Sequence, residues 1–345
     1  MPNSGVIENP ASRRDFLKAG FGTAALAALG AVTAARTARA CKECGGAGGP
    51  GDTMAVPMPM LNSDVDHAAN GFHPSEILTD FDWGRESRLP DGRMLREYSI
   101  SAIDKTIEVA SGITYPAFLF NGRLPGPTLR AREGERVRIT FTNGSAHPHT
   151  MHFHGIHPGA MDGVFEQVKP GRSFVYEFDA EPFGVHLYHC HTAPLAKHIA
   201  KGLYGTFIVD PAKGWPPADK EFVMVLSGID IDFDDENDFY VVNGIPFHYD
   251  RYPIQLKVGE LVRIFVVNIL EYDPINSFHI HANFFHYYPT GTSLTPAEFT
   301  DTVPFVQGQR GIMEFRYKFP GRYMFHAHKT EFAELGWTGL FDVTA

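Results

Sequence analysis

The sequence predicts an all-β protein built from two copies of one β-sandwich domain, at residues 96–212 and 222–345. Along both copies, short runs rich in β-forming residues are separated by Gly, Pro and Asn, which is typical of sandwiches and barrels. The run ERVRITF alternates, so that Val137, Ile139 and Phe141 share one face of a strand. No long amphipathic helix stands out.

An internal repeat supports the duplication. EGERVRITFTN at 133–143 returns as VGELVRIFVVN at 258–268, with six of eleven positions identical. Later, GRSFVYEFDAEPFGVHLYHCH is echoed by GQRGIMEFRYKFPGRYMFHAH. We therefore expect two similar domains joined near PAKGWPPADK, residues 211–220.

The N-terminus has the order of a twin-arginine export signal, which we place at residues 1–40. Paired arginines in SRRDFLKAG precede a short apolar run and then ARA at 38–40. The apolar run is too short to remain as a stable membrane span, so we expect a periplasmic or secreted protein. Removing residues 1–40, with five Lys/Arg and two Asp/Glu, changes the formal net charge from −10 to −13. An acidic mature protein is a poor candidate for binding nucleic acid.

Residues 41–95 are rich in Gly, Pro and polar residues, and we interpret them as a leader or linker with little core. The motif CKEC places Cys41 and Cys44 just after the expected cleavage site, where they could form a disulfide, bind metal, carry a lipid or simply lie in an exposed tail. Three methionines follow, Met54, Met58 and Met60. Cys190 then has no obvious partner in an oxidising compartment, so it needs another role.

Eight of the seventeen histidines fall into four His-x-His pairs, two in each copy. On a strand, residues i and i+2 lie on one face, so each pair presents two imidazoles together. Neutral imidazole is a good ligand for several transition metals. The pairs are His152/His154, His189/His191, His279/His281 and His326/His328.

The single thiol lies between two of these histidines and would point to the opposite face of the strand. A blue-copper site needs two imidazoles and one thiolate. His149, three residues before the first pair, and His198, eight residues after Cys190, complete that set. His147 could replace His149, because HPHTMHFHG offers both.

The second copy lacks this thiolate set. Asn276 stands at the position of His149, and Ala327 stands at the position of Cys190. The sequence therefore predicts that both copies bind metal through imidazole pairs and that only the first copy holds a thiolate site.

Four motifs carry a resemblance to a known family. HTMHFHG, HLYHCHTAPLAKHIAKGLYG, SFHIHANFF and MFHAHKTEFAELGW resemble the copper motifs of multicopper oxidases, and FNGRLPGPTLRAREGE resembles a first-domain signature of that family. The likeness covers roughly residues 96–345. It is most similar to the bacterial two-domain group with blue copper in the first domain, and it implies two cupredoxin-like Greek-key sandwiches in a homotrimer.

The resemblance also implies the cofactors and their ligands. It implies one type 1, one type 2 and two type 3 coppers per active unit, with the last three bound between the first domain of one subunit and the second domain of the next. The type 2 copper falls to His152 and His279. The type 3 pair falls to His154, His189, His191, His281, His326 and His328.

The type 1 motif departs from the family pattern after the cysteine. The family's second histidine follows five residues after the cysteine, where this sequence has Leu195, and three extra residues stand in TAPLAK. Alignment on IAKGL recovers His198 as the ligand and places Leu203 at the axial position. Without a thioether donor there, the reduction potential is expected to be raised.

Three carboxylates are candidates for moving protons. Asp162, in GAMDGV, resembles the family's carboxylate beside the type 2 site, while Glu331 and Glu334 follow the last pair. Asp301 occupies the position in the repeat that matches Asp162, so a structural role for both aspartates stays open.

The resemblance predicts an oxidase that couples four one-electron oxidations of a phenolic, aromatic or low-valent metal reductant to the reduction of O2 to water. Two alternatives remain. A copper nitrite reductase would leave His191, His281 and His328 without a role, and a periplasmic copper-binding or electron-carrier protein would need the thiolate set alone. The sequence does not identify the reductant.

Overall fold

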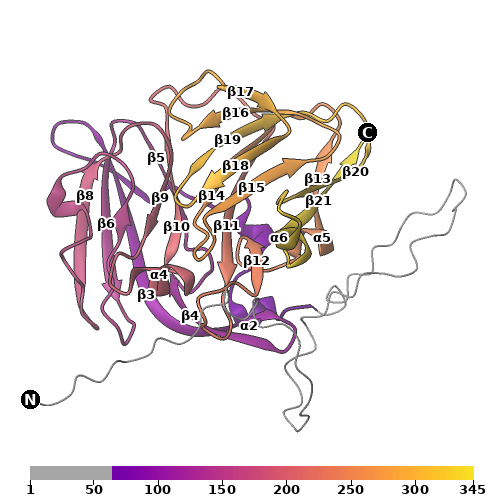
Figure 1. The fold of residues 1–345 in the computed structure, drawn as a ribbon. Coiled ribbons are helices and arrows are strands. Elements are labelled where there is room, and N and C mark those ends of the chain that lie inside the picture. Colours follow the sequence, from indigo (N-terminus) through magenta and orange to yellow (C-terminus); the bar gives the residue numbers. More distant parts are fainter. Residues whose placement is uncertain (1–63) are drawn as a thin grey trace, which may run out of the picture. The chain divides into compact units, whose positions relative to one another are not determined.

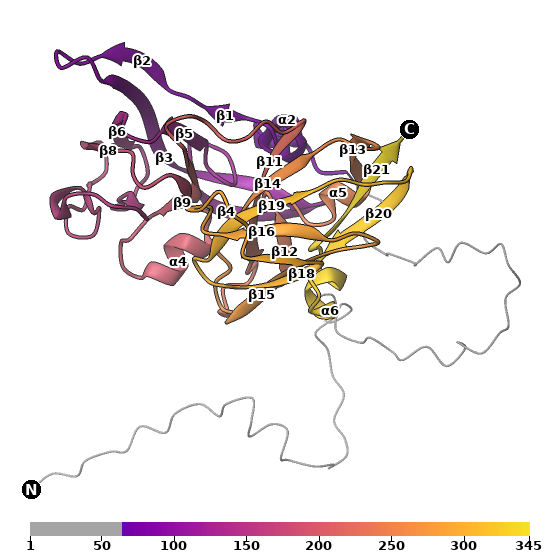
Figure 2. The same ribbon diagram turned by 90° about the horizontal axis from the view of Figure 1, so that it is seen from above.

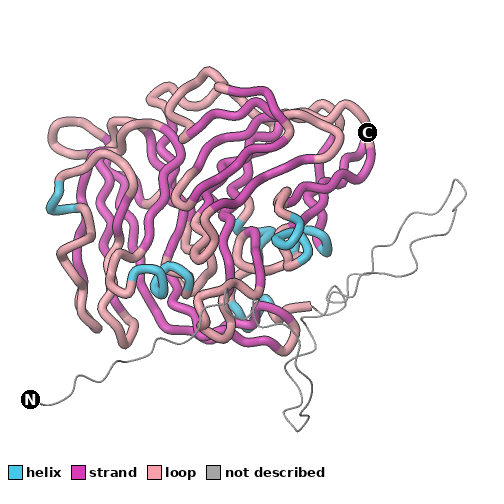
Figure 3. Tube along the Cα trace, viewed as in Figure 1, coloured by secondary structure: helices cyan, strands magenta, loops and turns pink. Residues whose placement is uncertain are grey.

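The structure is a computed structural model that describes residues 64–345, so the predicted export signal, Cys41, Cys44 and the three leader methionines lie outside the described residues. Strands dominate the described part, and its few helices are short (Figure 3). None of these helices combines the length and apolar character that crossing a membrane would need.

The first sandwich consists of two sheets. One sheet has the order β1-β5-β10-β9-β7, formed by Phe81–Asp82, Thr128–Arg132, Tyr204–Asp210, Gly184–His189 and His152–Phe153. The other has the order β2-β3-β6-β8, formed by Arg85–Arg88, Met94–Ala110, Arg136–Asn143 and Ser173–Asp179, with β4 (Ile113–Phe120) paired to β3. The alternating β6 side chains Val137, Ile139 and Phe141 are buried between the sheets, as the sequence predicts.

The second sandwich repeats this plan. One sheet has the order β12-β11-β14-β19-β16-β17, formed by Phe239–Val242, Lys220–Ile229, Val262–Asn268, Arg310–Phe315, Phe285–Pro289 and Glu298–Thr300. The other has the order β13-β21-β20-β15-β18, formed by Tyr252–Lys257, Thr338–Thr344, Gly321–His326, Ile275–Ile280 and Thr302–Val306. The all-β prediction is confirmed, and the two sandwiches lie side by side (Figures 1 and 2).

The segment before the first sandwich differs from the expectation of a leader with little core. Residues 64–95 include α2 (His67–Asn70), α3 (Pro74–Ile77) and the strands β1 and β2. Val65, Phe72 and Ile77 are buried in the core that joins the sandwiches. The Gly- and Pro-rich composition concealed these apolar anchors because they are spaced singly between polar residues.

The strand β9 borders two cores. Val185 and Leu187 enter the core between the sandwiches. Tyr188 of the strand, and Cys190 just after its end, enter the interior of the first sandwich. This alternation is the two-residue period of a strand. It turns His189, in register with Val185 and Leu187, away from the interior that holds the thiol.

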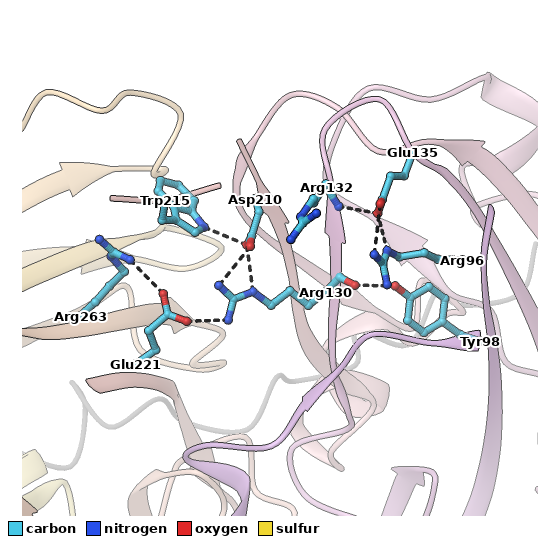
Figure 4. Close-up of polar contacts among 9 residues, drawn as sticks. All are labelled: Arg96, Tyr98, Arg130, Arg132, Glu135, Asp210, Trp215, Glu221 and Arg263. Carbon is cyan, nitrogen blue, oxygen red and sulfur yellow. Dashed lines mark hydrogen bonds and ion pairs between the residues drawn. The ribbon is translucent and has the colours of Figure 1, made fainter. Parts of the chain in front are cut away.

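Ion pairs fix the contact between the sandwiches (Figure 4). Arg130 of β5 pairs with Asp210 of β10 at 2.9 Å and with Glu221 of β11 at 2.7 Å. Glu221 also pairs with Arg263 of β14 at 2.9 Å, and the Trp215 indole donates to Asp210. The buried Arg130 guanidinium thus meets one carboxylate from each sandwich and joins them across the boundary.

Candidate metal centres

The first centre lies at one end of the first sandwich and joins three side chains that are far apart in sequence. His149 precedes β7, Cys190 follows β9, and His198 lies on α4 (Leu195–Ala200). Sγ of Cys190 is 3.7 Å from Nδ1 of His149 and 3.4 Å from Nδ1 of His198, and the two nitrogens are 3.1 Å apart. All three residues are buried, whereas the alternative residue His147 is exposed.

This donor set fits a copper ion. Two imidazoles and one sulfur are the ligands of a blue-copper site. Burial, followed by the neighbouring His198, lowers the pKa of His149 to about 4, so its imidazole is neutral. Nε2 of His149 is engaged by the Ser145 hydroxyl at 2.9 Å, which leaves Nδ1 facing the sulfur. Burial raises the pKa of the Cys190 thiol, so metal binding would have to displace its proton.

The residue predicted for the axial position is apolar. Leu203 is fully buried in the same core as Cys190, and its carbonyl oxygen accepts from the Cys190 amide at 2.9 Å. Phe118 covers the two imidazoles, with ring centroids 5.2 Å from His149 and 5.6 Å from His198. The donors are therefore buried beside an aromatic ring, and the predicted axial residue carries no thioether.

The second sandwich replaces all four positions by residues that do not bind metal. Ala327 takes the place of Cys190, and its amide donates to the carbonyl of Trp337 as Cys190 does to Leu203. The amide of Trp337 in turn donates to Phe332, as that of Leu203 does to His198. The Trp337 indole donates to Asn276 at 3.0 Å.

The larger side chains fill this space. Trp337 and Phe332 are fully buried, and Phe332 stacks on Tyr240 at 3.7 Å. The sequence identified the exchanges at Asn276 and Ala327, but those at Phe332 and Trp337 emerge from the repeated backbone hydrogen bonds.

The His-x-His pairs form one cluster in each sandwich. In the first sandwich, His152 of β7 lies opposite His189 of β9 in the strand register. His154 approaches His189 with 3.3 Å between Nε2 atoms, and the ring centroids of His189 and His191 are 6.0 Å apart. The four imidazoles of the first sandwich are therefore brought together, as predicted.

The second sandwich repeats this geometry. His279 of β15 lies opposite His326 of β20, and Nε2 of His281 is 2.9 Å from Nε2 of His326. His328 lies 5.2 Å from His279 between ring centroids. In the described part of the chain, the recorded ring contacts join these imidazoles only within their own sandwich.

Backbone carbonyls set the tautomers of four of these rings. Nδ1 of His152 is 2.7 Å from the Asp162 carbonyl oxygen, and Nδ1 of His279 is 2.9 Å from that of Asp301. His189 and His326 contact the carbonyls of the next residues in the same way. Because a carbonyl only accepts, each Nδ1 carries the proton and each Nε2 keeps a lone pair for a metal.

In each cluster, one hydroxyl binds the backbone amide of the last histidine. Thr150 accepts from the His191 amide at 3.0 Å, and Ser277 accepts from the His328 amide at 2.8 Å. Sequence analysis missed these residues, although both stand two positions before the first histidine of a cluster. Aligning the two copies would have found them.

The two clusters differ in burial. Burial is the main cause that lowers the pKa of His154 to about 3 and that of His189 to about 4. In the second sandwich, His281 and His326 are lowered in the same direction, again mainly by burial, but His281 and His328 are exposed. The second cluster is therefore open on one side.

The predicted carboxylates fall in two different environments. Oδ1 of Asp162 is 3.2 Å from Nδ1 of His152 and 3.8 Å from Nε2 of His157, so this carboxylate adjoins the first cluster. Glu331 and Glu334 lie exposed on α6 (Thr330–Glu334), and Glu331 pairs with Lys329 at 3.3 Å. Asp162 therefore has the better position for exchanging protons with an imidazole cluster.

An acidic loop borders the thiolate centre. Carboxylate oxygens of Asp230, Asp232 and Asp234 lie within 4.8 Å of one another. Lys197 of α4 pairs with Asp235 at 2.8 Å and donates to the Phe233 carbonyl. The loop thus packs against the helix that carries His198.

Comparisons with known proteins agree with this geometry. Residues 102–214 and 222–345 each match a family model described as multicopper oxidase. A crystal structure of a multicopper oxidase is 62% identical, with a TM-score of 0.80, over 81% of this chain and 100% of that one. A blue copper oxidase from Nitrosomonas europaea is 27% identical, with a TM-score of 0.66, over 72% of this chain and 86% of that one.

A second group of relatives has a different name. A copper-containing nitrite reductase of Neisseria meningitidis is 30% identical over 249 residues, which are 66% of this chain and 64% of that protein. The match thus spans just under two thirds of that relative's length. Similarity in sequence alone therefore leads to both oxidases and nitrite reductases.

Proposed function

Because this chain belongs to the multicopper oxidase family, we propose that it couples four one-electron oxidations of a reductant to the reduction of O2 to water. One type 1 copper would be held by His149, Cys190 and His198, with Leu203 at the axial position. One type 2 and two type 3 coppers would be held by the eight paired histidines. Copper bound at these donors supplies the one-electron oxidation and the oxygen chemistry.

The observation that carries this proposal is the tripeptide His189-Cys190-His191. Its thiol belongs to the buried sulfur and imidazole set, while both of its imidazoles belong to the neighbouring cluster. Cys190 is therefore joined to a histidine of the neighbouring cluster by a single peptide bond on each side. This path gives an electron a route from the reductant side to the oxygen side that avoids solvent.

The residues around the clusters support the other steps. Asp162 stands beside His152, where its carboxylate can hold and release protons next to the first cluster. Phe118 shields the thiolate set from water, and His198 on α4 is the donor nearest to the acidic loop. We propose that the reductant approaches near His198.

The homotrimer remains a proposal, and the incomplete second cluster supports it. Each sandwich supplies four imidazoles, and an exposed phenylalanine lies close in sequence to the aspartate whose carbonyl contacts each set. Phe165, three residues after Asp162, is 86% exposed, and Phe299, two residues before Asp301, is 63% exposed. A neighbouring copy that covers both would bury these rings and complete a site for three ions.

A copper nitrite reductase is the second candidate, because relatives of that name match the chain. That activity would need one imidazole-bound copper in addition to the thiolate site, so His191, His281 and His328 would have no role. The geometry favours the oxidase, because each of these three rings lies against another histidine of its cluster. His191 contacts His189, His281 contacts His326, and His328 contacts His279. Export by the twin-arginine signal at residues 1–40, to the periplasm or outside, also remains a proposal.

Purified, copper-loaded protein tests the proposed function. We expect oxygen uptake with a phenolic or low-valent metal donor, with water rather than peroxide as product. Oxygen is replaced by nitrite in a parallel anaerobic assay, in which we expect no nitric oxide. Nitric oxide formation without oxygen uptake would establish the reductase, and blue protein without either activity would establish an electron carrier.

A further inference from the structure

Three histidines outside the eight paired ones form a cluster of their own. His67 begins α2, His73 precedes α3, and His248 begins α5 (His248–Arg251) of the second sandwich. We propose that these three side chains form a separate site for a divalent transition-metal ion of the zinc or copper type. The ion would tie the segment before the first sandwich to the second sandwich.

The spacing of the rings carries the proposal. The ring centroids of His67, His73 and His248 are 4.2, 4.9 and 5.3 Å apart. The trio His279, His281 and His326 has separations of 5.0 to 5.3 Å. Within residues 64–345, the other trios of imidazoles this close all come from the His-x-His pairs.

One nitrogen of the cluster is buried without a hydrogen-bond partner. Nδ1 of His67 is this atom. A buried polar atom without a partner is unfavourable, because it has lost its bond to water and gained none in return. A metal ion bound at Nδ1 would supply the missing partner.

His248 and His73 also offer an Nδ1 atom to a metal ion. Nε2 of His248 is 2.8 Å from the Ser75 hydroxyl, which leaves its Nδ1 for a metal. Nδ1 of His73 accepts only a 3.2 Å bond from the Ser75 amide, which a metal could displace. Three Nδ1 atoms are thus the donors that the geometry offers.

The charge state of the rings suits a cation. Burial, followed by the two neighbouring imidazoles, lowers the pKa of His248 to about 2, and burial likewise lowers the pKa of His67. Neutral imidazoles are the form that binds metal. Tyr252 stacks on His248 at 4.8 Å and donates to Asp64 at 2.7 Å, so it closes one side of the cluster. The nearby cationic group is Arg251, whose guanidinium is paired with the Asp64 carboxylate at 3.3 Å.

Binding requires a small rearrangement. Among the described residues, the groups whose donor atoms already lie within 4.8 Å of one another do not include this trio. His67 and His73 are only half-buried and lie at the ends of four-residue helices, and their rings would have to turn to bring the donor atoms together. Three imidazoles with one open position suit Zn2+ or Cu2+.

Metal analysis of the full chain tests this site. Copper-loaded wild-type protein is equilibrated with zinc, dialysed, and analysed for copper and zinc per chain. We expect one ion more per chain in the wild type than in His67→Gln or His73→Gln, and at least about tenfold weaker binding of the last ion in these variants. Zinc as the missing ion identifies a zinc site, and copper as the missing ion identifies a copper site.

The exposed His286 provides the matched control, because it belongs to none of the clusters. His286→Gln should keep the extra ion, and all variants should keep the blue absorption, which shows that they are folded and that the thiolate centre is intact. Zinc should raise the unfolding temperature of the wild type but not that of His67→Gln. Equal metal content and equal affinity in the wild type and both variants would overturn the proposal and leave the oxidase proposal untouched.

Discussion

The two sandwiches use the same backbone positions for opposite purposes. In the first sandwich the amide of Cys190, just after β9, donates to the carbonyl of Leu203. In the second sandwich the amide of Ala327, just after β20, donates to the carbonyl of Trp337 in the same way. In the first sandwich the Cys190 sulfur converges with the imidazoles of His149 and His198. In the second sandwich packed aromatic rings, including Trp337, fill the matching space. The comparison teaches that the fold supplies a place for a metal site and that side-chain volume decides whether it is one.

The imidazole clusters show the reverse relation. Both sandwiches keep four rings in the same register and fix them by the same carbonyl contacts. Burial differs, because the imidazoles of the first cluster are buried or half-buried, whereas His281 and His328 of the second are exposed. The proposed centre between two copies would need the imidazoles of both sandwiches but the thiolate of only one.

Removing the thiol should have the largest effect on this comparison. Cys190→Ser should abolish the blue absorption and lower oxygen uptake by about a thousandfold or more, because ligands that act as a unit fail together. Ala327→Ser, at the matching position of the second sandwich, should keep the colour and most of the activity while losing roughly 1–3 kcal/mol of stability for a buried hydroxyl. Activity in Cys190→Ser would show that electrons enter elsewhere.

Removing one imidazole from the open cluster should separate colour from turnover. His281→Gln should keep the blue absorption and lower oxygen uptake by at least about a hundredfold, because this ring belongs to the second cluster alone. Absorption spectra and oxygen uptake, measured on the same samples, check this. Full uptake in the variant would show that the second sandwich takes no part in the reaction, and His286→Gln serves as the unaffected control.

Acid should destabilise the metal-free protein through the first cluster more than through the second. An unfolded imidazole titrates near its ordinary pKa of 6.5, whereas folded His154 does so at about 3 and His189 at about 4. Between these values the unfolded chain binds more protons, so the free energy of unfolding should fall as pH drops from 6.5 towards 4. Urea unfolding at several pH values should show a flatter dependence in His154→Gln than in His281→Gln. Equal slopes in the two variants would contradict the difference in burial.

The smallest expected effect concerns the axial position. Leu203→Met should lower the reduction potential of the blue centre, because a thioether donor stabilises the oxidised ion. Stability should change by less than about 1.5 kcal/mol, since the two side chains have similar volumes. A redox titration followed at the blue band measures the shift, and an unchanged potential would place the axial position elsewhere.

The sequence was sufficient for the all-β class and for the pairing of imidazoles, because a two-residue strand period translates directly into a shared face. It also placed His149 and His198 beside Cys190, through spacing and family resemblance together. It could not reveal that Phe332 and Trp337 occupy the positions of His198 and Leu203, because the residues around these positions differ between the two copies. Nor could it reveal the contact of His67 and His73 with His248, which depends on folding residues 64–95 against the second sandwich.

The central proposal is a continuous route from one thiolate to a cluster that two chains complete. Co-expression of His154→Gln with His281→Gln, each inactive alone, tests it most directly. If the first sandwich of one chain meets the second sandwich of another, random mixing restores intact sites at about one interface in four, and oxygen uptake should return to about a quarter of the wild-type rate. Mixed assemblies that stay as inactive as either variant would show that the cluster does not form between chains.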